Sequence, residues 1–173
     1  TEIYQVDLAR RRLAWGEVLQ REIHRLRSRD TSCGTLRKTD DHLWVEIAKL
    51  LPFSLNLEQL EVLNLLRQDF DNGIRIQRLL HGEVGSGKTA VAFCLAMAVV
   101  AQGGQVALLA PTEILARQHL NNFMQWIGGA DARVVGFFGD DAGILRRKSL
   151  SVLSKDAPLI AIGTHALFGK EVV

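Results

Sequence analysis

A glycine-rich stretch at residues 82–89 constrains the fold of this chain more than any other feature. It consists of Gly82, four further residues and then Gly-Lys-Thr, which is the full pattern of a phosphate-binding loop. Glycines permit positive φ angles, so backbone N–H groups can surround a phosphate, and the following helix points its positive end at the same anion. A chance lysine in a glycine-rich turn is the alternative, but strand, turn and helix signals all lie where the motif requires them.

The pattern gives each residue of the loop a role. Lys88 is expected to reach the β- and γ-phosphates of a nucleotide, and the hydroxyl of Thr89 is expected to coordinate Mg²⁺. These two are the candidate catalytic residues, and Thr89 is also the candidate metal ligand. The predicted nucleotide-binding residues of the loop are Gly82, Glu83, Val84, Gly85, Ser86, Gly87, Lys88 and Thr89.

The composition is that of a globular protein in a reducing compartment. Hydrophobic residues make up 47% of the 173 residues, which suits a packed core. Cys33 lies in a polar stretch and Cys94 in an apolar helical pattern, so neither is expected to bind a metal or form a disulfide. The apolar run 90–101 is too short to span a membrane, and no signal peptide is recognisable. We therefore expect a cytoplasmic location and no membrane partner, and, because the first residue is Thr1, a piece of a longer protein.

Charge is unevenly distributed, although the net charge is only +2. Seven arginines and two glutamates lie between Arg10 and Arg29. Such a patch can attract nucleic acid, or it can be the solvated face of a helix, which is the commoner case.

Two helices are predicted in the first fifty residues. The first covers about 4–28, where apolar side chains recur at helical spacing, and a polar linker at 29–35 follows it. The second begins at Asp40 or Asp41 and runs to about Leu50.

A third helix is predicted just before the phosphate loop. Asn56 and Gln59 have the spacing of a capping box at its start, and the Asn-Gly pair at 72–73 ends it. Its expected buried stripe consists of Val62, Leu65, Leu66 and Phe70.

From residue 76 onward, apolar strands alternate with helices. Strand signals centre on 79–80, 106–109, 134–137 and 159–162, and helical signals cover 88–101, 113–127 and 142–153. The strands are apolar throughout, as parallel strands covered on both faces are. The predicted fold class is therefore α/β, a parallel sheet covered by helices on both faces, with ligands at the carboxyl ends of the strands.

Two more loops follow strands at the edge where the phosphate loop is expected. Pro-Thr-Glu at 111–113 leads into a helix, and Gly-Thr-His at 163–165 follows the last strand. Taken alone, Thr112 can be a helix N-cap with Glu113 favouring the helix dipole. Thr164 can likewise be a cap, and His165 an ordinary loop residue.

Taken together, these stretches resemble the ordered motifs of the RecG family of branch-migrating DNA helicases, in superfamily 2. The matching segments are Gly-Glu-Val-Gly-Ser-Gly-Lys-Thr at 82–89, Ala-Pro-Thr-Glu-Ile-Leu-Ala at 110–116 with Gln118-His119, Asn-Asn-Phe at 121–123 with Trp126, and Gly-Thr-His-Ala-Leu-Phe at 163–168. The resemblance implies that residues 51–173 are the first part of a P-loop (RecA-like) motor lobe. The lobe would be incomplete, because the sequence stops before the Asp-Glu-x-His box of that family. Residues 1–50 would be a helical connector.

The resemblance also implies site roles. Gln59 would contact adenine, in addition to its place in the capping box, and the phosphate loop would hold ATP with Mg²⁺. The residues expected along the DNA backbone are Pro111, Thr112, Glu113, Gly163, Thr164 and His165. Turns with free N–H groups and hydroxyls suit phosphates, and such contacts carry no sequence preference.

Three positions depart from the family pattern. Glu83 replaces an aspartate, and Asn56 replaces a threonine. Phe-Gly-Asp at 138–140 lies where a Thr-Gly-Ser-like DNA contact is common. Because Asp140 would repel a phosphate, no DNA contact is assigned there.

The function implied for the parent protein is that of an ATP-dependent DNA helicase that remodels stalled forks and Holliday junctions in recombination and repair. Its expected partner is branched or duplex DNA, its expected state a monomer and its expected location the bacterial cytoplasm, in the nucleoid. Without the acidic box the fragment alone is expected to hydrolyse ATP poorly. The alternatives are a transcription–repair coupling translocase, and a nucleotide-responsive DNA-binding scaffold that does not hydrolyse ATP.

Overall fold

The computed structural model describes residue 19 and residues 39–73, 76–128, 133–138 and 157–168. The chain divides into two compact units, Thr1–Cys33 and Gly34–Val173. Of the first unit only Leu19 is described, and it is helical and exposed. The rest of the predicted helix 4–28, the linker 29–35 and the predicted helix 142–153 lie outside the described residues.

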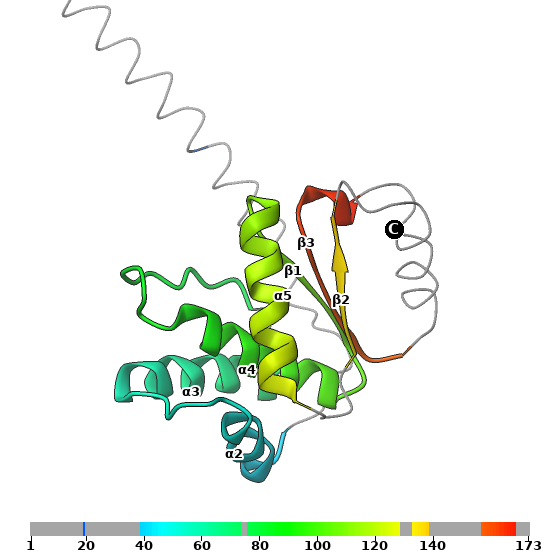
Figure 1. Cartoon of the computed structure of the whole chain (residues 1–173). Coiled ribbons are helices and arrows are strands. Elements are labelled where there is room, and N and C mark those ends of the chain that lie inside the picture. The colour runs from blue at the N-terminus through cyan, green and yellow to red at the C-terminus, as the bar shows by residue number, and fades with distance from the viewer. Residues whose placement is uncertain (1–18, 20–38, 74–75, 129–132, 139–156, 169–173) are drawn as a thin grey trace, which may run out of the picture. The chain divides into compact units, whose positions relative to one another are not determined.

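A parallel sheet forms the centre of the second unit (Figure 1). Its strands β1 (Gln105–Leu109), β2 (Arg133–Phe137) and β3 (Leu159–Gly163) are arranged in the order β1-β3-β2. This confirms three of the predicted strands and their parallel pairing. β3 is the middle strand, and all five of its residues are buried. The edge strand β1, in contrast, alternates between exposed and half-buried residues, so only one of its faces is covered.

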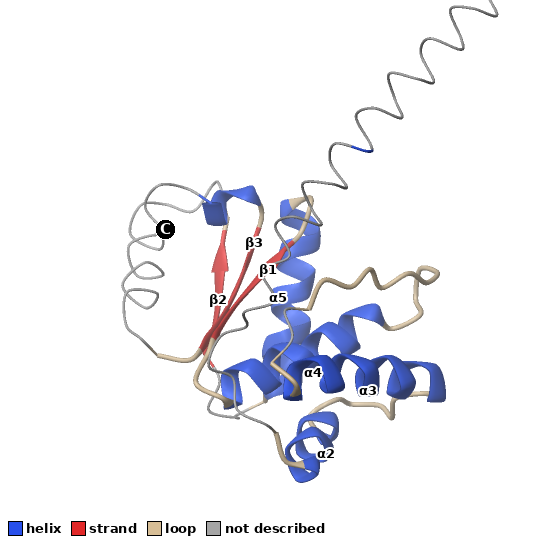
Figure 2. Cartoon of the chain, turned by 180° about the vertical axis from the view of Figure 1, so that it is seen from behind, coloured by secondary structure: helices blue, strands red, loops and turns tan. Residues whose placement is uncertain are grey.

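Two helices cover one face of the sheet, α4 (Lys88–Ala101) and α5 (Glu113–Ile127). Both views of the chain show them on the same side of the strands (Figures 1 and 2). Ile160 and Ile162 of β3 join their apolar residues in one core. On the opposite face, Leu159 and Ala161 pack with Leu167 of the short 3-10 helix η1 (His165–Phe168).

The phosphate-loop helix α4 is apolar on nearly every side, because it lies between the sheet and other helices. Its buried residues are Ala90, Val91, Phe93, Cys94, Ala96, Met97, Ala98 and Val100. Phe93 meets Phe123 and Trp126 of α5 edge-on, with ring centroids 5.0 and 5.2 Å away. This aromatic cluster locks α4 against α5.

Two more helices precede the phosphate loop, α2 (Asp41–Lys49) and α3 (Leu57–Asp71). Asp40 caps α2, and Asn56 and Gln59 form the predicted capping box at the start of α3. The predicted stripe of α3 is partly wrong. Leu65 is 52% exposed, whereas Leu63, which was not predicted, is buried with Leu66 and Phe70. The spacing of these three residues places them on one face of the helix, and this is the face that packs on the neighbouring helices.

The strand predicted at residues 79–80 does not form. Residues 76–80 are irregular and pair with no strand of the described sheet, and the side chain of Leu79 is 92% exposed. Arg78 makes a bidentate ion pair with Asp69 near the end of α3, at 2.7 and 3.0 Å. This pair ties the segment to a helix instead of to the sheet.

None of the helices in the described ranges has the length and apolarity that a membrane span requires.

Phe93 offers a direct test of this core. We expect Phe93→Ala to lower the free energy of unfolding by about 3–5 kcal/mol, because it removes a ring that is fully buried between two others. Urea unfolding followed by circular dichroism measures the change. Leu79→Ala is the matched control and should cost about 0.5 kcal/mol or less, since that side chain is exposed. Equal losses in the two variants would contradict the packing described here.

Candidate nucleotide site and nucleic-acid interface

The phosphate loop has the backbone geometry that anion binding needs. Gly85 and Gly87 have positive φ angles of +88° and +79°, which side-chain-bearing residues rarely adopt. Gly87 is the N-cap of α4, and no side chain caps this helix. Among the described residues no side-chain oxygen accepts from the first N–H groups of α4, and a bound phosphate can accept from N–H groups at a helix start.

The side chain of Lys88 lies over the loop. Its ammonium donates hydrogen bonds to the carbonyl oxygens of Gly82 and Glu83, at 2.8 and 2.5 Å, and to the hydroxyl of Ser86 at 3.2 Å. The loop thus already surrounds one charged group with oxygen atoms. A nucleotide phosphate would offer the ammonium an ionised acceptor in place of neutral carbonyls, and opposite charges attract each other more strongly than a charge and a carbonyl dipole do.

Gln59 joins the start of α3 to this loop. Its side-chain oxygen accepts from the N–H of Asn56 at 2.9 Å, while its side-chain nitrogen donates to the carbonyl of Ser86 at 2.9 Å. The side chain lies so close to Gly87 that a Cβ at that position would collide with it. The predicted capping box is therefore confirmed, and the same amide also reaches the phosphate loop.

A small cavity of about 90 Å³ opens beside Gln59. Its walls come from the start of α3, the segment ahead of the loop, the loop itself and α4. The lining residues are Glu58, Gln59, Val62, Leu80, His81, Gly82, Ser86, Lys88 and Val91. Four of the residues predicted to hold a nucleotide thus line one cavity: Gln59 of α3, Gly82 and Ser86 of the loop, and Lys88 of α4.

A metal ion at this site would depend on the nucleotide. Thr89 is half-buried in the first turn of α4 and offers one hydroxyl. The described ranges contain no group of three His, Cys, Asp or Glu residues that could hold a metal ion. Mg²⁺ usually keeps several waters and binds through substrate phosphates together with one or two protein ligands, so it fits here as a nucleotide-bound ion.

The predicted DNA-contacting loops leave the sheet at one level. In the parallel register Leu109 of β1 and Phe137 of β2 both pair with Gly163 of β3. The segments that follow these three residues therefore start at the same carboxyl edge, which we call the strand-end rim. The loop ahead of α4, in contrast, reaches away from the strands (Figure 2).

The rim residues differ in what they expose. Pro111, Thr112 and His165 are exposed. Thr112 also caps α5, because its hydroxyl accepts from the N–H of Leu115 at 3.3 Å. Thr164 is only 8% exposed. A Cβ at Gly163 would collide with the carbonyl of Phe137, so this glycine allows β2 and β3 to approach each other.

Glu113 is neutralised by a neighbour that the sequence analysis did not single out. Arg117, one helical turn along α5, contacts its carboxylate through two nitrogens, at 2.8 and 2.7 Å. The guanidinium also lies 4.0 Å from the centre of the Phe138 ring, just after β2. The i,i+4 spacing of Glu113 and Arg117 was a usable signal for the ion pair, whereas nothing local in the sequence signals the contact with Phe138.

Burial shifts the pKa values of two side chains, Cys94 in α4 and His119 in α5. Burial raises the pKa of the Cys94 thiol to about 11, so the thiol stays protonated at neutral pH. Burial lowers the pKa of His119. Neither residue contributes a charge to the loop or the rim at neutral pH.

Gly87→Ala tests the loop geometry. The new side chain would be strained at φ +79° and would push Gln59 away from Ser86, so we expect ATP affinity to fall about tenfold or more. Titration with a fluorescent ATP analogue measures the change. Gly85→Ala is the matched control, since it has the same backbone strain but nothing within 4 Å of the new Cβ. It should weaken binding less; equal effects would show that the position of Gln59 does not matter.

Comparison with known proteins identifies the family. A sequence model of the DEAD/DEAH box helicases matches residues 57–172. The chain is 39% identical to the ATP-dependent DNA helicase RecG of Treponema pallidum over 127 residues, which are 73% of this chain and 18% of that protein. It is 36% identical to RecG of Bacillus subtilis over 171 residues, which are 96% of this chain and 25% of that protein.

Solved structures agree. RecG bound to a three-way DNA junction matches 96% of the chain and 23% of that protein, with a TM-score of 0.76 and 34% identity. A hypothetical ATP-dependent RNA helicase from Sulfolobus tokodaii shares the fold at 18% identity, with a TM-score of 0.54. The chain spans about a fifth to a quarter of the length of its RecG relatives. The family match over residues 57–172, together with the phosphate loop and the parallel sheet, shows that this chain belongs to the DEAD/DEAH box helicase family.

Proposed function

We propose that this chain is the ATP-binding part of an ATP-dependent DNA helicase of the RecG type, and that the full-length protein remodels branched DNA such as stalled forks and Holliday junctions. The observation that carries the proposal is the match of 96% of the chain to RecG bound to a three-way DNA junction. The helicase family model, which matches residues 57–172, includes the phosphate loop and both loops of the strand-end rim.

ATP binds between the start of α3 and the phosphate loop in this proposal. Gln59 lies beside the cavity and contacts the adenine. Lys88 exchanges the carbonyls of Gly82 and Glu83 for the β- and γ-phosphates, and Thr89 provides a hydroxyl ligand for Mg²⁺. The ion, when bound, neutralises charge on the phosphates. These residues thus position the triphosphate, and positioning together with charge stabilisation is the main contribution of a protein to phosphoryl transfer.

DNA lies along the strand-end rim in this proposal, with its backbone against residues 111–113 and 163–165. Pro111, Thr112 and His165 are exposed there, and the positive end of α5 points to the same place. We propose that the protein acts as a monomer in recombination and repair, in the cytoplasm of a bacterium and on its nucleoid. The RecG name of its relatives favours this reading over a transcription–repair coupling translocase.

Lys88→Ala in the full-length protein tests the function. We expect fork DNA to stimulate ATP hydrolysis by the unaltered protein more strongly than linear duplex does. The variant should lose about 100-fold or more of that rate, because the phosphates lose their ammonium partner. Lys49→Ala is the matched control, since Lys49 lies exposed on α2 and contacts Glu46 of the same helix. It should keep the full rate.

Two results would contradict this account. An unchanged rate in Lys88→Ala would remove the phosphate-loop assignment. Binding of ATP without hydrolysis on any DNA would instead favour the nucleotide-responsive scaffold.

Arg117→Leu tests the rim. The substitution leaves the carboxylate of Glu113 without its partner next to the DNA backbone, so we expect affinity for duplex DNA to fall about fivefold at low salt. Fluorescence anisotropy measures the affinity. Adding Glu113→Gln to Arg117→Leu should restore binding to the level of Glu113→Gln alone. If the double variant stays weak, Arg117 does not act by neutralising Glu113.

A further inference from the structure

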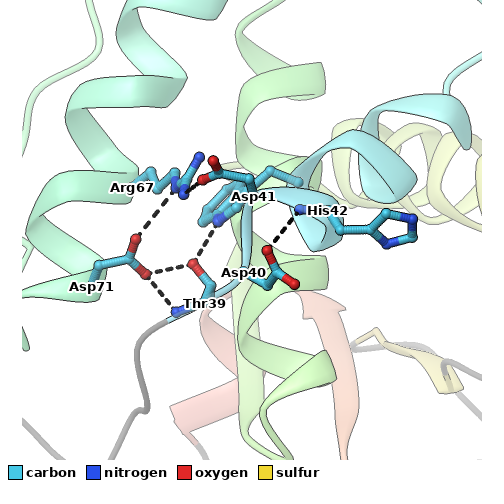
Figure 3. A network of polar contacts seen from close by, with 7 residues as sticks. Thr39, Asp40, Asp41, His42, Arg67 and Asp71 are labelled. Carbon is cyan, nitrogen blue, oxygen red and sulfur yellow. Dashed lines mark hydrogen bonds and ion pairs between the residues drawn. The ribbon is translucent and has the colours of Figure 1, made fainter.

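A partly buried polar network joins Thr39, which precedes the N-cap of α2, to the last residue of α3 (Figure 3). Thr39 is only 5% exposed. Its N–H and its hydroxyl both donate to one carboxylate oxygen of Asp71, at 2.9 and 2.5 Å. The same hydroxyl accepts from the indole N–H of Trp44 at 2.7 Å. Thr39 thus joins the first residues of the α2 region to the last residue of α3.

Arg67 adds charge to this network. Its guanidinium pairs with Asp71 at 3.3 Å and also with Asp41 of α2. Burial alone would raise the pKa of Asp71, but the hydrogen bonds from Thr39 and Arg67 outweigh burial and hold this pKa below its ordinary value. The carboxylate is therefore ionised at neutral pH. We call Thr39, Asp41, Trp44, Arg67 and Asp71 the Thr39 network.

Apolar packing under the network makes α2 part of the same core as α3 and α4. Trp44 meets Phe70 of α3 edge-on, with ring centroids 6.1 Å apart. Ile47 and Leu51 are buried in the core that also contains the residues of α4. The match to the helicase family begins only at residue 57. α2 is thus built into the fold although it precedes that match.

The other end of α3 contacts the phosphate loop. Gln59 is in the first turn of α3 and donates to Ser86, whereas Asp71 is the last residue of the same helix. A helix of 15 residues is about 22 Å long and moves as a stiff unit. One helix therefore contacts the nucleotide site at its start and the Thr39 network at its end.

We propose that the Thr39 network makes the position of α2 depend on whether a nucleotide occupies the phosphate loop, because α3 links the two as a rigid helix. This inference rests on the proposed ATP binding. Without nucleotide, Gln59 contacts Ser86 and Asn56. With ATP bound it also contacts the nucleotide, so the start of α3 has different partners in the free and the ATP-bound protein. Asp71 accepts two hydrogen bonds from Thr39, and Arg67 of α3 pairs with Asp41 of α2, so a shift of α3 also displaces α2. Thr39 and Asp71 are accordingly positioning residues, at the point where the chain enters the nucleotide-binding lobe.

Hydrogen–deuterium exchange on the full-length protein tests this proposal. Exchange is followed in peptides covering 41–49 and 82–89, with and without a non-hydrolysable ATP analogue and Mg²⁺. In the unaltered protein we expect the analogue to slow exchange about fivefold or more in both segments. In Thr39→Val, which keeps the side-chain shape but removes the hydroxyl, the loop should still respond while 41–49 should not.

A control variant and a second test variant separate the role of the Thr39 network from a general loss of α2 structure. Glu46→Gln breaks the exposed pair with Lys49 inside α2 and should behave as the unaltered protein. Should Thr39→Val release α2 altogether, Asp71→Asn keeps an oxygen for Thr39 but replaces a charged acceptor with a neutral one, and should give a partial loss of the response. A response of the loop without any response of 41–49 in the unaltered protein would overturn the proposal, and so would a full response in both variants. A loop that does not respond at all would overturn the ATP site itself, and the inference with it.

Discussion

The candidate nucleotide site depends on two hydrogen bonds made by the side-chain amide of Gln59. Its oxygen satisfies a backbone N–H at the start of α3, and its nitrogen satisfies a carbonyl of the phosphate loop. Gly87 must lack a side chain for this amide to approach, and the same glycine adopts the positive φ that starts α4. One contact between groups 27 residues apart therefore joins the loop, where α4 begins, to the start of α3.

The sheet determines the positions of the loops at the strand-end rim. β3 is buried on both faces, by α4 and α5 on one side and by Leu167 on the other among the described residues. Its register with β1 and β2 brings three strand ends to one rim. Close approach of β2 and β3 needs a glycine at 163, and the guanidinium of Arg117 joins α5 to the end of β2. Packing of the sheet thus fixes the level of the loops proposed to follow DNA.

Features encoded by local chemistry were predictable from the sequence. α4 begins at Lys88 and α5 at Glu113, as predicted, because a glycine turn and a threonine cap determine where a helix starts. The capping box of α3 was predicted for the same reason. The parallel strands at 105–109, 133–137 and 159–163 followed from apolar runs between helices.

Features that depend on distant partners were not predictable. Leu79 and Leu80 look like strand residues, yet a strand needs a neighbour to pair with, and the Arg78–Asp69 ion pair ties this segment to α3 instead. The buried face of α3 was also predicted wrongly in part. Leucines occur at both 63 and 65, and only the packing of the helix determines that Leu63 is the buried one. The contacts of Lys88 with loop carbonyls and of Arg117 with Phe138 likewise arise only in the folded chain.

A structure of the full-length protein with a non-hydrolysable ATP analogue, Mg²⁺ and forked DNA would test the proposed nucleotide and DNA sites together. We expect the ammonium of Lys88 to have left the carbonyls of Gly82 and Glu83 for the β- and γ-phosphates. We also expect Gln59 at the adenine and the DNA backbone along the strand-end rim. A nucleotide bound elsewhere, with Lys88 still on the loop carbonyls, would show that the proposed nucleotide site is wrong.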